Sequence, residues 1–231
     1  MDNGLLQKEE VFHQIIHDLK SPLASVLGLS EIFIRVLSPD LNENQKEVIR
    51  KIKKHTQFAL ELIEDLLEIQ NLNVNFSVDK QLIPIKPLIE NAVQGHLIKA
   101  AEKNIEIKIN TLTDISIPAD ERRLKQVMDN LISNALKFSH PETQIIISTK
   151  IDKEYFHIMI TDQGIGIPKE EISNLFQPFS QISSRPTGGE KSTGLGLSIV
   201  KKIIELHKGE ITIESEEAKG STFTIKLPLV E

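Results

Sequence analysis

The sequence predicts an α+β protein in two parts. The first is an antiparallel helical hairpin that pairs with a second copy into a four-helix bundle, and the second is a two-layer α/β domain. Two observations lead to this prediction. Up to residue 69 the apolar residues recur with alternating spacings of four and three. Beyond residue 84, segments in which apolar and polar residues alternate, as in strands, are interspersed with short amphipathic helices. With 231 residues, 39% of them hydrophobic, the chain can build two cores.

The first helix is expected from Leu5 to Leu37, because the turn formers Ser38, Pro39 and Asp40 follow it. Its apolar seam comprises Phe12, Ile16, Leu19, Leu23, Val26, Ser30, Phe33 and Leu37. The second helix is expected to begin between residues 42 and 44, with a seam of Val48, Ile52, His55, Ala59, Leu62, Leu66 and Ile69. One hairpin cannot bury both seams, so a homodimer is expected, with His55 in the bundle core or at its edge.

A domain boundary is predicted between residues 76 and 77, where the four-three spacing ends, which gives domains of residues 1–76 and 77–231. Helices are expected at residues 87–103, 121–139 and 195–207, and strands at 105–110, 144–151, 155–162, 211–215 and 222–229. Asp120 is expected to cap the second of these helices, with Arg122 and Arg123 on its polar side. The pattern indicates helices on one face of a mixed sheet.

Charge and composition narrow the possible partners. The net charge of −6 gives no reason to expect nucleic acid as a partner. Cysteine is absent, so disulfides are excluded and a cytoplasmic location is expected. No apolar run is long enough to span a membrane and no signal segment is evident, so we expect no membrane span in this chain. A sensing domain or membrane segment upstream, or sensing by another molecule, stays open.

The stretch FHQIIHDLKSPL holds a histidine that could react. His17 follows the seam residue Ile16 by one position, about 100° around the helix, so it should lie exposed at the rim of the seam. Asp18 can take or orient an imidazole proton, and Ser21 lies one turn after His17. A solvated helix face would explain the same residues. Pro22 argues against it, because a proline inside a helix costs ~3 kcal/mol.

This stretch resembles the phosphoacceptor box of bacterial two-component sensor histidine kinases, with His17, Asp18, Ser21, Pro22 and Leu23 in matching positions. The resemblance implies that His17 takes a phosphoryl group from ATP, that Asp18 assists the proton, and that a response regulator receiver domain receives the phosphoryl group. Related kinases with phosphatase activity carry threonine or asparagine at the position of Ser21, which suggests that its hydroxyl positions a water. Alternatively, Ser21 satisfies a carbonyl freed at Pro22.

A second constellation lies on the helix after Asp120. Asn130 and Asn134 share a face and Lys137 follows one turn later, so amide oxygens could hold Mg²⁺ while the lysine reaches a phosphate. Alone, this triplet is more typical of a solvated helix. The string NLISNALKFS, however, resembles the asparagine box of the GHKL (Bergerat) ATP-binding fold. The resemblance implies that Asn134, with Asn130, holds the metal, that Lys137 contacts phosphate and that Phe138 belongs to the nucleotide site.

Two glycine-rich strings follow. Asp162-Gln-Gly164-Ile-Gly166 ends a predicted strand and resembles the first glycine box of that fold, which implies that Asp162 binds the adenine amino group, with Ile167 beside it. The string Thr193-Gly194-Leu195-Gly196-Leu197 opens a helix, whose N-terminus favours phosphate, and resembles the second glycine box. Ser192 stands where that box usually has its first glycine.

Between these strings, Phe176-Gln-Pro-Phe179 resembles the phenylalanine box of the same fold. Residues 180–191 lack apolar periodicity and are expected to form a mobile lid. Arg185 could reach the γ-phosphate or be solvated, and both interpretations stay open.

Together these resemblances imply a homodimeric sensor histidine kinase that uses Mg·ATP and that could also dephosphorylate its regulator. One alternative is a GHKL ATPase, but in those enzymes a glutamate activates water where this chain has Asn130, and an amide cannot act as that base. A second alternative is a catalytically silent dimeric scaffold that binds a response regulator. The intact boxes argue against it, although Ser192 keeps it open.

Overall fold

The computed structural model describes residues 3–73, 78–111, 113–180, 186–188, 190 and 192–229. The chain forms two compact units, the N-terminal unit of residues 1–73 and the C-terminal unit of residues 74–231. The domain boundary predicted between residues 76 and 77 falls among residues 74–77, outside the described part.

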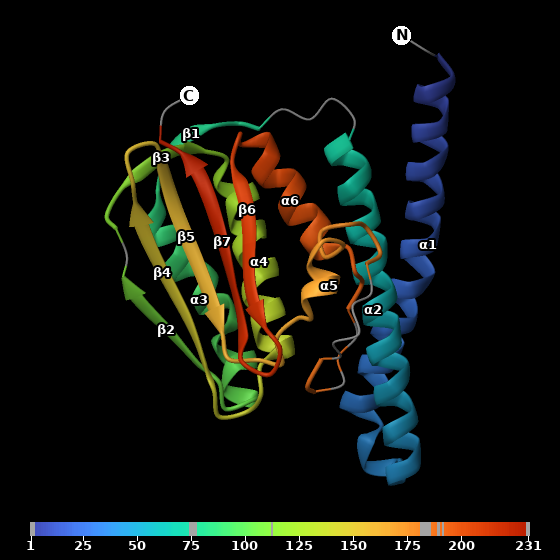
Figure 1. Ribbon diagram of the computed structural model, residues 1–231. Coiled ribbons are helices and arrows are strands. Elements are labelled where there is room, and N and C mark those ends of the chain that lie inside the picture. Colours follow the sequence, from blue (N-terminus) through green and yellow to red (C-terminus); the bar gives the residue numbers. More distant parts are fainter. Residues whose placement is uncertain are drawn as a thin grey trace. The chain divides into compact units, whose positions relative to one another are not determined.

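The N-terminal unit is the predicted hairpin (Figure 1). Helix α1 (Asn3–Val36) runs through Pro22, a 3-10 turn follows at Ser38–Asp40, and α2 (Glu43–Asn73) returns. Reciprocal bonds at the start of α2 explain why it begins there. Asn42 Oδ1 accepts from the backbone N–H of Gln45 at 2.9 Å, and Gln45 Oε1 accepts from the N–H of Asn42 at 2.9 Å.

The stripe buried inside the hairpin differs from the predicted seam on α2. Thr56, Leu60 and Ile63 are buried, each one position after a predicted seam residue, and Ile16 and Ser30 are buried on α1. Phe12 lies outside the described side chains. The reason for the displacement is that α2 has a second apolar stripe beside the first, and a two-helix hairpin can cover only one of them.

The other stripe remains exposed in the single chain, and so does His55. Its large apolar side chains are between 39% and 61% exposed on α1 and α2 and comprise Val11, Ile15, Leu19, Val26, Leu29, Ile32, Phe33, Val36, Leu37, Val48 and Ile52. So many apolar side chains on one pair of helices are typical of a surface that a further protein chain covers.

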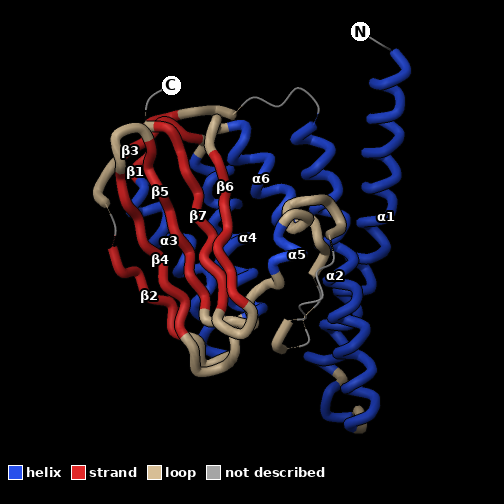
Figure 2. The backbone as a smooth tube through the Cα atoms, viewed as in Figure 1, coloured by secondary structure: helices blue, strands red, loops and turns tan. Residues whose placement is uncertain are grey.

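The C-terminal unit is built on a five-stranded mixed sheet with the order β2-β4-β5-β7-β6, in which only β2 and β4 run parallel (Figure 2). The strands are β2 (Glu106–Thr111), β4 (Gln144–Ile151), β5 (Tyr155–Asp162), β6 (Glu210–Glu216) and β7 (Gly220–Pro228). All five were predicted. The sequence did not predict β3 (Ser116–Ala119), which pairs with β1 (Gln81–Pro84) as a separate two-stranded sheet.

Three helices cover one face of the sheet, as predicted: α3 (Ile85–Glu102), α4 (Glu121–Phe138) and α6 (Gly196–Leu206) (Figure 1). A single turn, α5 (Lys169–Ile172), precedes the phenylalanine box. The core between the layers is aliphatic, with Leu131, Ile147 and Ile203 fully buried.

The start of α4 confirms one prediction and corrects another. Asp120 caps the helix, since its Oδ1 accepts from the backbone N–H of Arg123 at 3.1 Å. Arg122 is exposed as expected, but Arg123 is only 4% exposed, so the prediction that both arginines lie on the polar side was wrong. Arg123 can be buried because its guanidinium donates to Gln126 Oε1 at 2.9 Å.

Candidate functional site

His17 lies on the outside of α1, as predicted. Its side chain is 81% exposed, and its Nδ1 lies 3.5 Å from Asp18 Oδ1, the upper limit of a hydrogen bond. The same carboxylate oxygen accepts from Gln14 Nε2 at 3.0 Å, which fixes its position. With Nδ1 turned toward Asp18, the other ring nitrogen, Nε2, is the one available to an incoming group.

Ser21 is exposed one turn after His17. Within the described part of the chain its hydroxyl makes no hydrogen bond to a carbonyl; instead, the carbonyl of Ser21 accepts from Ser25 Oγ at 3.1 Å. The geometry therefore favours a hydroxyl turned to solvent over one that satisfies a carbonyl near Pro22.

A pocket opens in the C-terminal unit between α4, the end of β5 and the start of β7. Its lining brings together six of the residues predicted for the nucleotide site, namely Asn134, Phe138, Asp162, Gly166, Ile167 and Leu197. Ala135, Leu175, Ser221 and Phe223 complete the lining. The pocket is mostly apolar with one buried carboxylate, which is the chemistry expected for a flat, weakly polar ring that carries a hydrogen-bond donor.

Asp162 is the only carboxylate in this lining and is 6% exposed. Its Oδ1 accepts from the backbone N–H of Gly164 at 2.8 Å. Burial raises the pKa of Asp162 to about 6, although hydrogen bonds from the backbone N–H groups of Gly164 and Ser221 act in the opposite direction. A buried carboxyl group with a pKa raised in this way is typical of a functional site rather than of a hydrophobic core.

Two glycines of the glycine boxes allow close contact between the backbone and neighbouring segments. Gly166 has φ +67°, and a Cβ there would lie 2.1 Å from the carbonyl oxygen of Glu216, so a side chain cannot be accommodated. A Cβ on Gly196 would lie 2.9 Å from Asn130 Oδ1. The first turn of α6 therefore packs directly against Asn130 of the asparagine box, which places that amide at the helix N-terminus.

The other predicted site residues that the structure describes do not belong to this lining. Leu195 is fully buried and its backbone N–H donates to Thr193 Oγ1 at 3.2 Å, which shapes the turn before α6 around Gly194. Lys137 lies in the last turn of α4. Arg185 lies outside the described residues.

The donors present fit Mg²⁺ in the way the asparagine box implies. Amide oxygens are suitable ligands for a hard cation. Asn134 lines the pocket, and Asn130 Oδ1 lies against the first turn of α6. No cluster of three or more His, Cys, Asp or Glu that could hold a metal occurs among the described residues. Such an ion would therefore depend on amide, phosphate and water oxygens, a ligand set typical of Mg²⁺ at nucleotides.

Four residues of the lining were not predicted from the sequence, and two of them, Ser221 and Phe223, come from β7. Ser221 donates its backbone N–H to Asp162 and shares a 2.9 Å hydrogen bond between hydroxyls with Ser215. Phe223 lines the pocket from β7. The signal in the sequence that points to both residues is the string KGSTF, which begins at Lys219.

Comparison with known families agrees with both halves of the chain. Residues 7–74 match the His Kinase A (phospho-acceptor) domain, and residues 119–231 match the histidine kinase-, DNA gyrase B- and HSP90-like ATPases. The chain belongs to the histidine kinase family. The fold and the family predicted from the sequence are confirmed.

Two curated relatives are named as kinases. The chain is 31% identical to the circadian input-output histidine kinase CikA of Synechococcus elongatus, over 96% of this chain and 30% of the relative. It is 31% identical to the autoinducer 2 sensor kinase/phosphatase LuxQ of Vibrio vulnificus, over 92% of this chain and 25% of the relative. The chain thus spans less than a third of the length of these two relatives.

Solved histidine kinase structures have the same fold. Full-length ShkA in complex with AMPPNP matches with a TM-score of 0.75 and 25% identity, over 96% of this chain and 46% of that one. The Acinetobacter baumannii histidine kinase AdeS matches with a TM-score of 0.66 and 25% identity, over 93% of this chain and 98% of that one.

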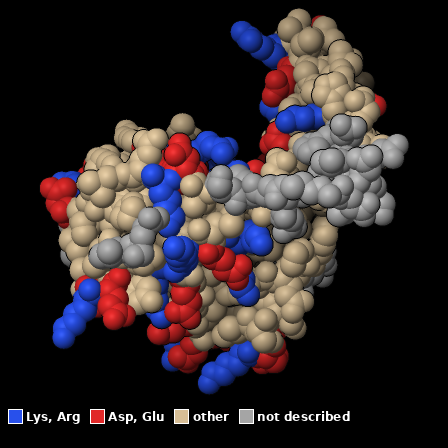
Figure 3. Space-filling model, turned by 90° about the horizontal axis from the view of Figure 1, so that it is seen from above, with Lys and Arg blue, Asp and Glu red and all other residues tan. Residues whose placement is uncertain are grey.

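The visible surface carries charged side chains of both signs. Figure 3 shows basic and acidic side chains interspersed on the visible face, without a broad patch of one sign. Within the described residues, no helix combines the length and the apolar character needed to cross a membrane.

Proposed function

We propose that this histidine kinase domain pair transfers the γ-phosphoryl group of Mg·ATP to His17 and then to an aspartate of a response regulator receiver domain. The proposal depends on one observation: the same chain carries both an exposed histidine beside a carboxylate and a pocket lined by a buried aspartate. The first supplies a nucleophile and the second recognises a nucleotide.

In this proposal His17 attacks through Nε2. Asp18, held by Gln14 at 3.0 Å, keeps the proton on Nδ1 and stabilises the positive charge that develops on the ring as Nε2 bonds to phosphorus. The bond from phosphorus to the β,γ-bridging oxygen breaks, and ADP leaves. The contribution of the protein is mostly positioning and charge neutralisation, as for other phosphoryl transfers.

The C-terminal unit would hold ATP with the adenine amino group donating to Asp162 and the base between the apolar walls at Ile167 and Phe223. Lys137 and the N-terminus of α6 would face the phosphates. A bound Mg²⁺, held through Asn134 with support from Asn130, would neutralise phosphate charge.

We further propose that two copies of the chain associate through the exposed apolar side chains of α1 and α2. Thr56, Leu60 and Ile63 are already covered within one hairpin, so the second stripe, with Val48 and Ile52, is left for the partner copy. Two hairpins would then form the four-helix bundle expected from the sequence. A cytoplasmic location is part of the same proposal.

Incubation with γ-labelled ATP tests the proposed function. The protein should become labelled, and the label should be lost in acid and kept in base, which is the behaviour of a phosphorylated imidazole. Release of inorganic phosphate with no labelled protein would instead favour a GHKL-type ATPase. Nucleotide binding with neither product would favour a silent scaffold.

Replacing Ser21 with alanine tests the proposed phosphatase step. Because the Ser21 hydroxyl makes no bond to a carbonyl within the described part of the chain, it can hydrogen-bond a water aimed at a phosphorylated receiver. Ser21→Ala should keep autophosphorylation and slow the loss of phosphate from the regulator by about tenfold, equivalent to ~1.4 kcal/mol of transition-state stabilisation. Ser25→Ala, on the same helix, is the matched control. An unchanged rate of regulator dephosphorylation in Ser21→Ala would contradict the proposed role.

A further inference from the structure

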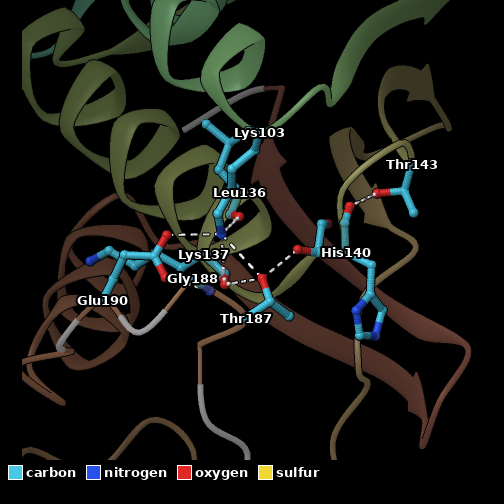
Figure 4. A network of polar contacts seen from close by, with 9 residues as sticks. Lys103, Leu136, Lys137, His140, Thr143, Thr187, Gly188 and Glu190 are labelled. Atoms are coloured by element: carbon cyan, nitrogen blue, oxygen red, sulfur yellow. Dashed lines mark hydrogen bonds and ion pairs between the residues drawn. The ribbon is translucent and has the colours of Figure 1, made fainter.

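A network of polar contacts joins three separate segments at the C-terminal end of α4 (Figure 4). Lys103, just past the end of α3, donates through Nζ to the carbonyl oxygen of Leu136 at 2.9 Å and to Thr187 Oγ1 at 3.1 Å. The same ammonium lies 2.8 Å from Glu190 Oε1. The carbonyl oxygen of Lys137, at 3.3 Å, is a fourth and more distant acceptor, so the three N–H donors of this ammonium are all satisfied.

The acceptors of this network are themselves fixed. Thr187 has one hydroxyl proton, which it donates to the carbonyl of Ser139 at 2.6 Å, so its oxygen remains an acceptor for Lys103. The backbone N–H of Thr187 donates to the carbonyl of Lys137 at 3.0 Å. The second carboxylate oxygen of Glu190 accepts from the N–H of Gly188 at 3.0 Å. The donors and acceptors of the network are therefore matched to one another.

These contacts complete the end of α4. The last carbonyl groups of a helix lack partners within it, and a positive charge near them is favourable. Here Lys103 and Thr187 bind the carbonyls of Leu136 and Lys137, while the next carbonyl, that of Phe138, accepts from the N–H of Ile165 in the first glycine box at 3.2 Å. The turn that carries Lys137 is thus tied both to the adenine side of the pocket and to the segment before the second glycine box.

We propose that Lys103, held by Glu190 and Thr187, is a positioning residue for the phosphate end of the bound nucleotide. The proposal rests on the proposed function, in which Lys137 contacts phosphate. Lys103 does not line the pocket, and its charge is matched by Glu190 across a pair in which the two side chains are only 17% and 33% exposed. It acts through the last turn of α4 and through Thr187 and Glu190, rather than by touching the nucleotide.

The described part of the predicted lid makes contacts that the sequence did not predict. Thr187 and Glu190 belong to the segment that is expected to be mobile, and they contact the end of α4 and Lys103. The physical reason is that a partly buried ammonium at a helix C-terminus requires acceptors, and these two side chains provide them. This end of the segment is anchored to the helix that carries the asparagine box.

The removal of the Lys103 ammonium should affect the phosphates more than the base. The carbonyl of Leu136 would lose its donor and Glu190 would lose its counter-ion, which should loosen the last turn of α4 and its connection to Glu190. Asp162 and the apolar walls of the pocket would keep their contacts, because none of them touches Lys103. A purely structural role for Lys103 would instead weaken adenosine and ATP binding equally.

Lys103→Met in the full chain tests this proposal, with Lys99→Met as the matched control. Lys99 is exposed one turn earlier on α3, so the two variants change the net charge equally. Lys103→Met should weaken Mg·ATP binding by about tenfold and adenosine binding by less than about twofold in calorimetric titrations, while Lys99→Met should change neither. Unfolding midpoints of both variants would show whether each is folded.

Glu190→Gln provides a second, milder route if Lys103→Met does not fold. It keeps the shape but removes the counter-charge, so it should lower the affinity for Mg·ATP by a smaller factor. The double variant should bind no more weakly than Lys103→Met alone, because the two residues act as one unit. The inference about Lys103 would be overturned if Lys103→Met and Lys99→Met bound Mg·ATP equally well, or if ATP and adenosine lost affinity equally. The proposed function would not be affected by either result. An unmodified chain that does not bind Mg·ATP would overturn the proposed function as well.

Discussion

Replacing His17 with alanine should abolish phosphate incorporation from γ-labelled ATP, while the affinity for ATP should stay within about twofold of that of the unmodified chain. The reason is a division of labour between the two units. His17 is an exposed side chain on α1, whereas every residue that lines the pocket belongs to the C-terminal unit. Alanine removes the nucleophile and, because the site is exposed, should leave the stability of the hairpin nearly unchanged.

Two measurements on the same preparation decide this prediction: labelled protein after electrophoresis and ATP affinity by calorimetry. His13→Ala is the matched control, because it removes another histidine of the same helix one turn earlier. It should retain labelling. Label retained in His17→Ala would place the phosphoacceptor on another residue, and a large loss of ATP affinity would show that His17 also contributes to nucleotide binding.

Asp162→Asn should weaken nucleotide binding by about 10- to 100-fold, the range expected for one charge-assisted hydrogen bond. Asp162 accepts backbone N–H bonds from Gly164 and Ser221, so an asparagine there must turn its amide nitrogen toward one of these donors or toward the adenine amino group. In either arrangement the amide nitrogen, a hydrogen-bond donor, faces another donor. The measurement is the dissociation constant for Mg·ATP at pH 8. An unchanged constant would mean that the base binds elsewhere.

The raised pKa of Asp162 gives this prediction a pH dependence. Binding through the carboxylate should weaken as the pH falls through about 6, where the group takes up a proton. The free energy of unfolding of the chain without nucleotide depends on pH in the opposite direction. The folded chain keeps a proton that the unfolded chain releases above the ordinary aspartate pKa of 3.8, so the free energy of unfolding falls as the pH rises from 3.8 to about 6 and stays lower above that.

Asp162→Asn should therefore be more stable than the unmodified chain at pH 8 by up to about 3 kcal/mol, and should lose this advantage near pH 4. Asp152→Asn is the matched control. Hydrogen bonds from the backbone N–H groups of Glu154 and Tyr155, and then His157, lower the pKa of Asp152 to about 2, so this variant should be less stable at neutral pH. Denaturant unfolding at pH 4 and pH 8 measures both, and a destabilised Asp162→Asn at pH 8 would contradict the linkage argument.

The sequence by itself determined the two helices of the hairpin, the strands of the main sheet and most of the candidate site residues. The repeat of four and three residues located α1 and α2, and alternation located the five strands of the main sheet, because burial on one face imposes a period on a helix or strand wherever it lies. The boxes around Asn134, Asp162 and Gly196 were recognisable because each is a short, contiguous string in which the local backbone geometry requires particular residue types.

Only the tertiary structure decided which faces meet and which distant residues become partners. The buried stripe of α2 lies one position from the predicted seam, because two apolar stripes compete and local periodicity does not say which of them the neighbouring helix covers. The burial of Arg123 and the pairing of β1 with β3 likewise depend on neighbours that are remote in the chain. Lys103 and Thr187 are separated by 84 positions, and neither belongs to a recognisable motif. The last carbonyl groups of α4 have no partner within the helix and need hydrogen-bond donors. The fold brings Lys103 and Thr187 to them from distant parts of the chain.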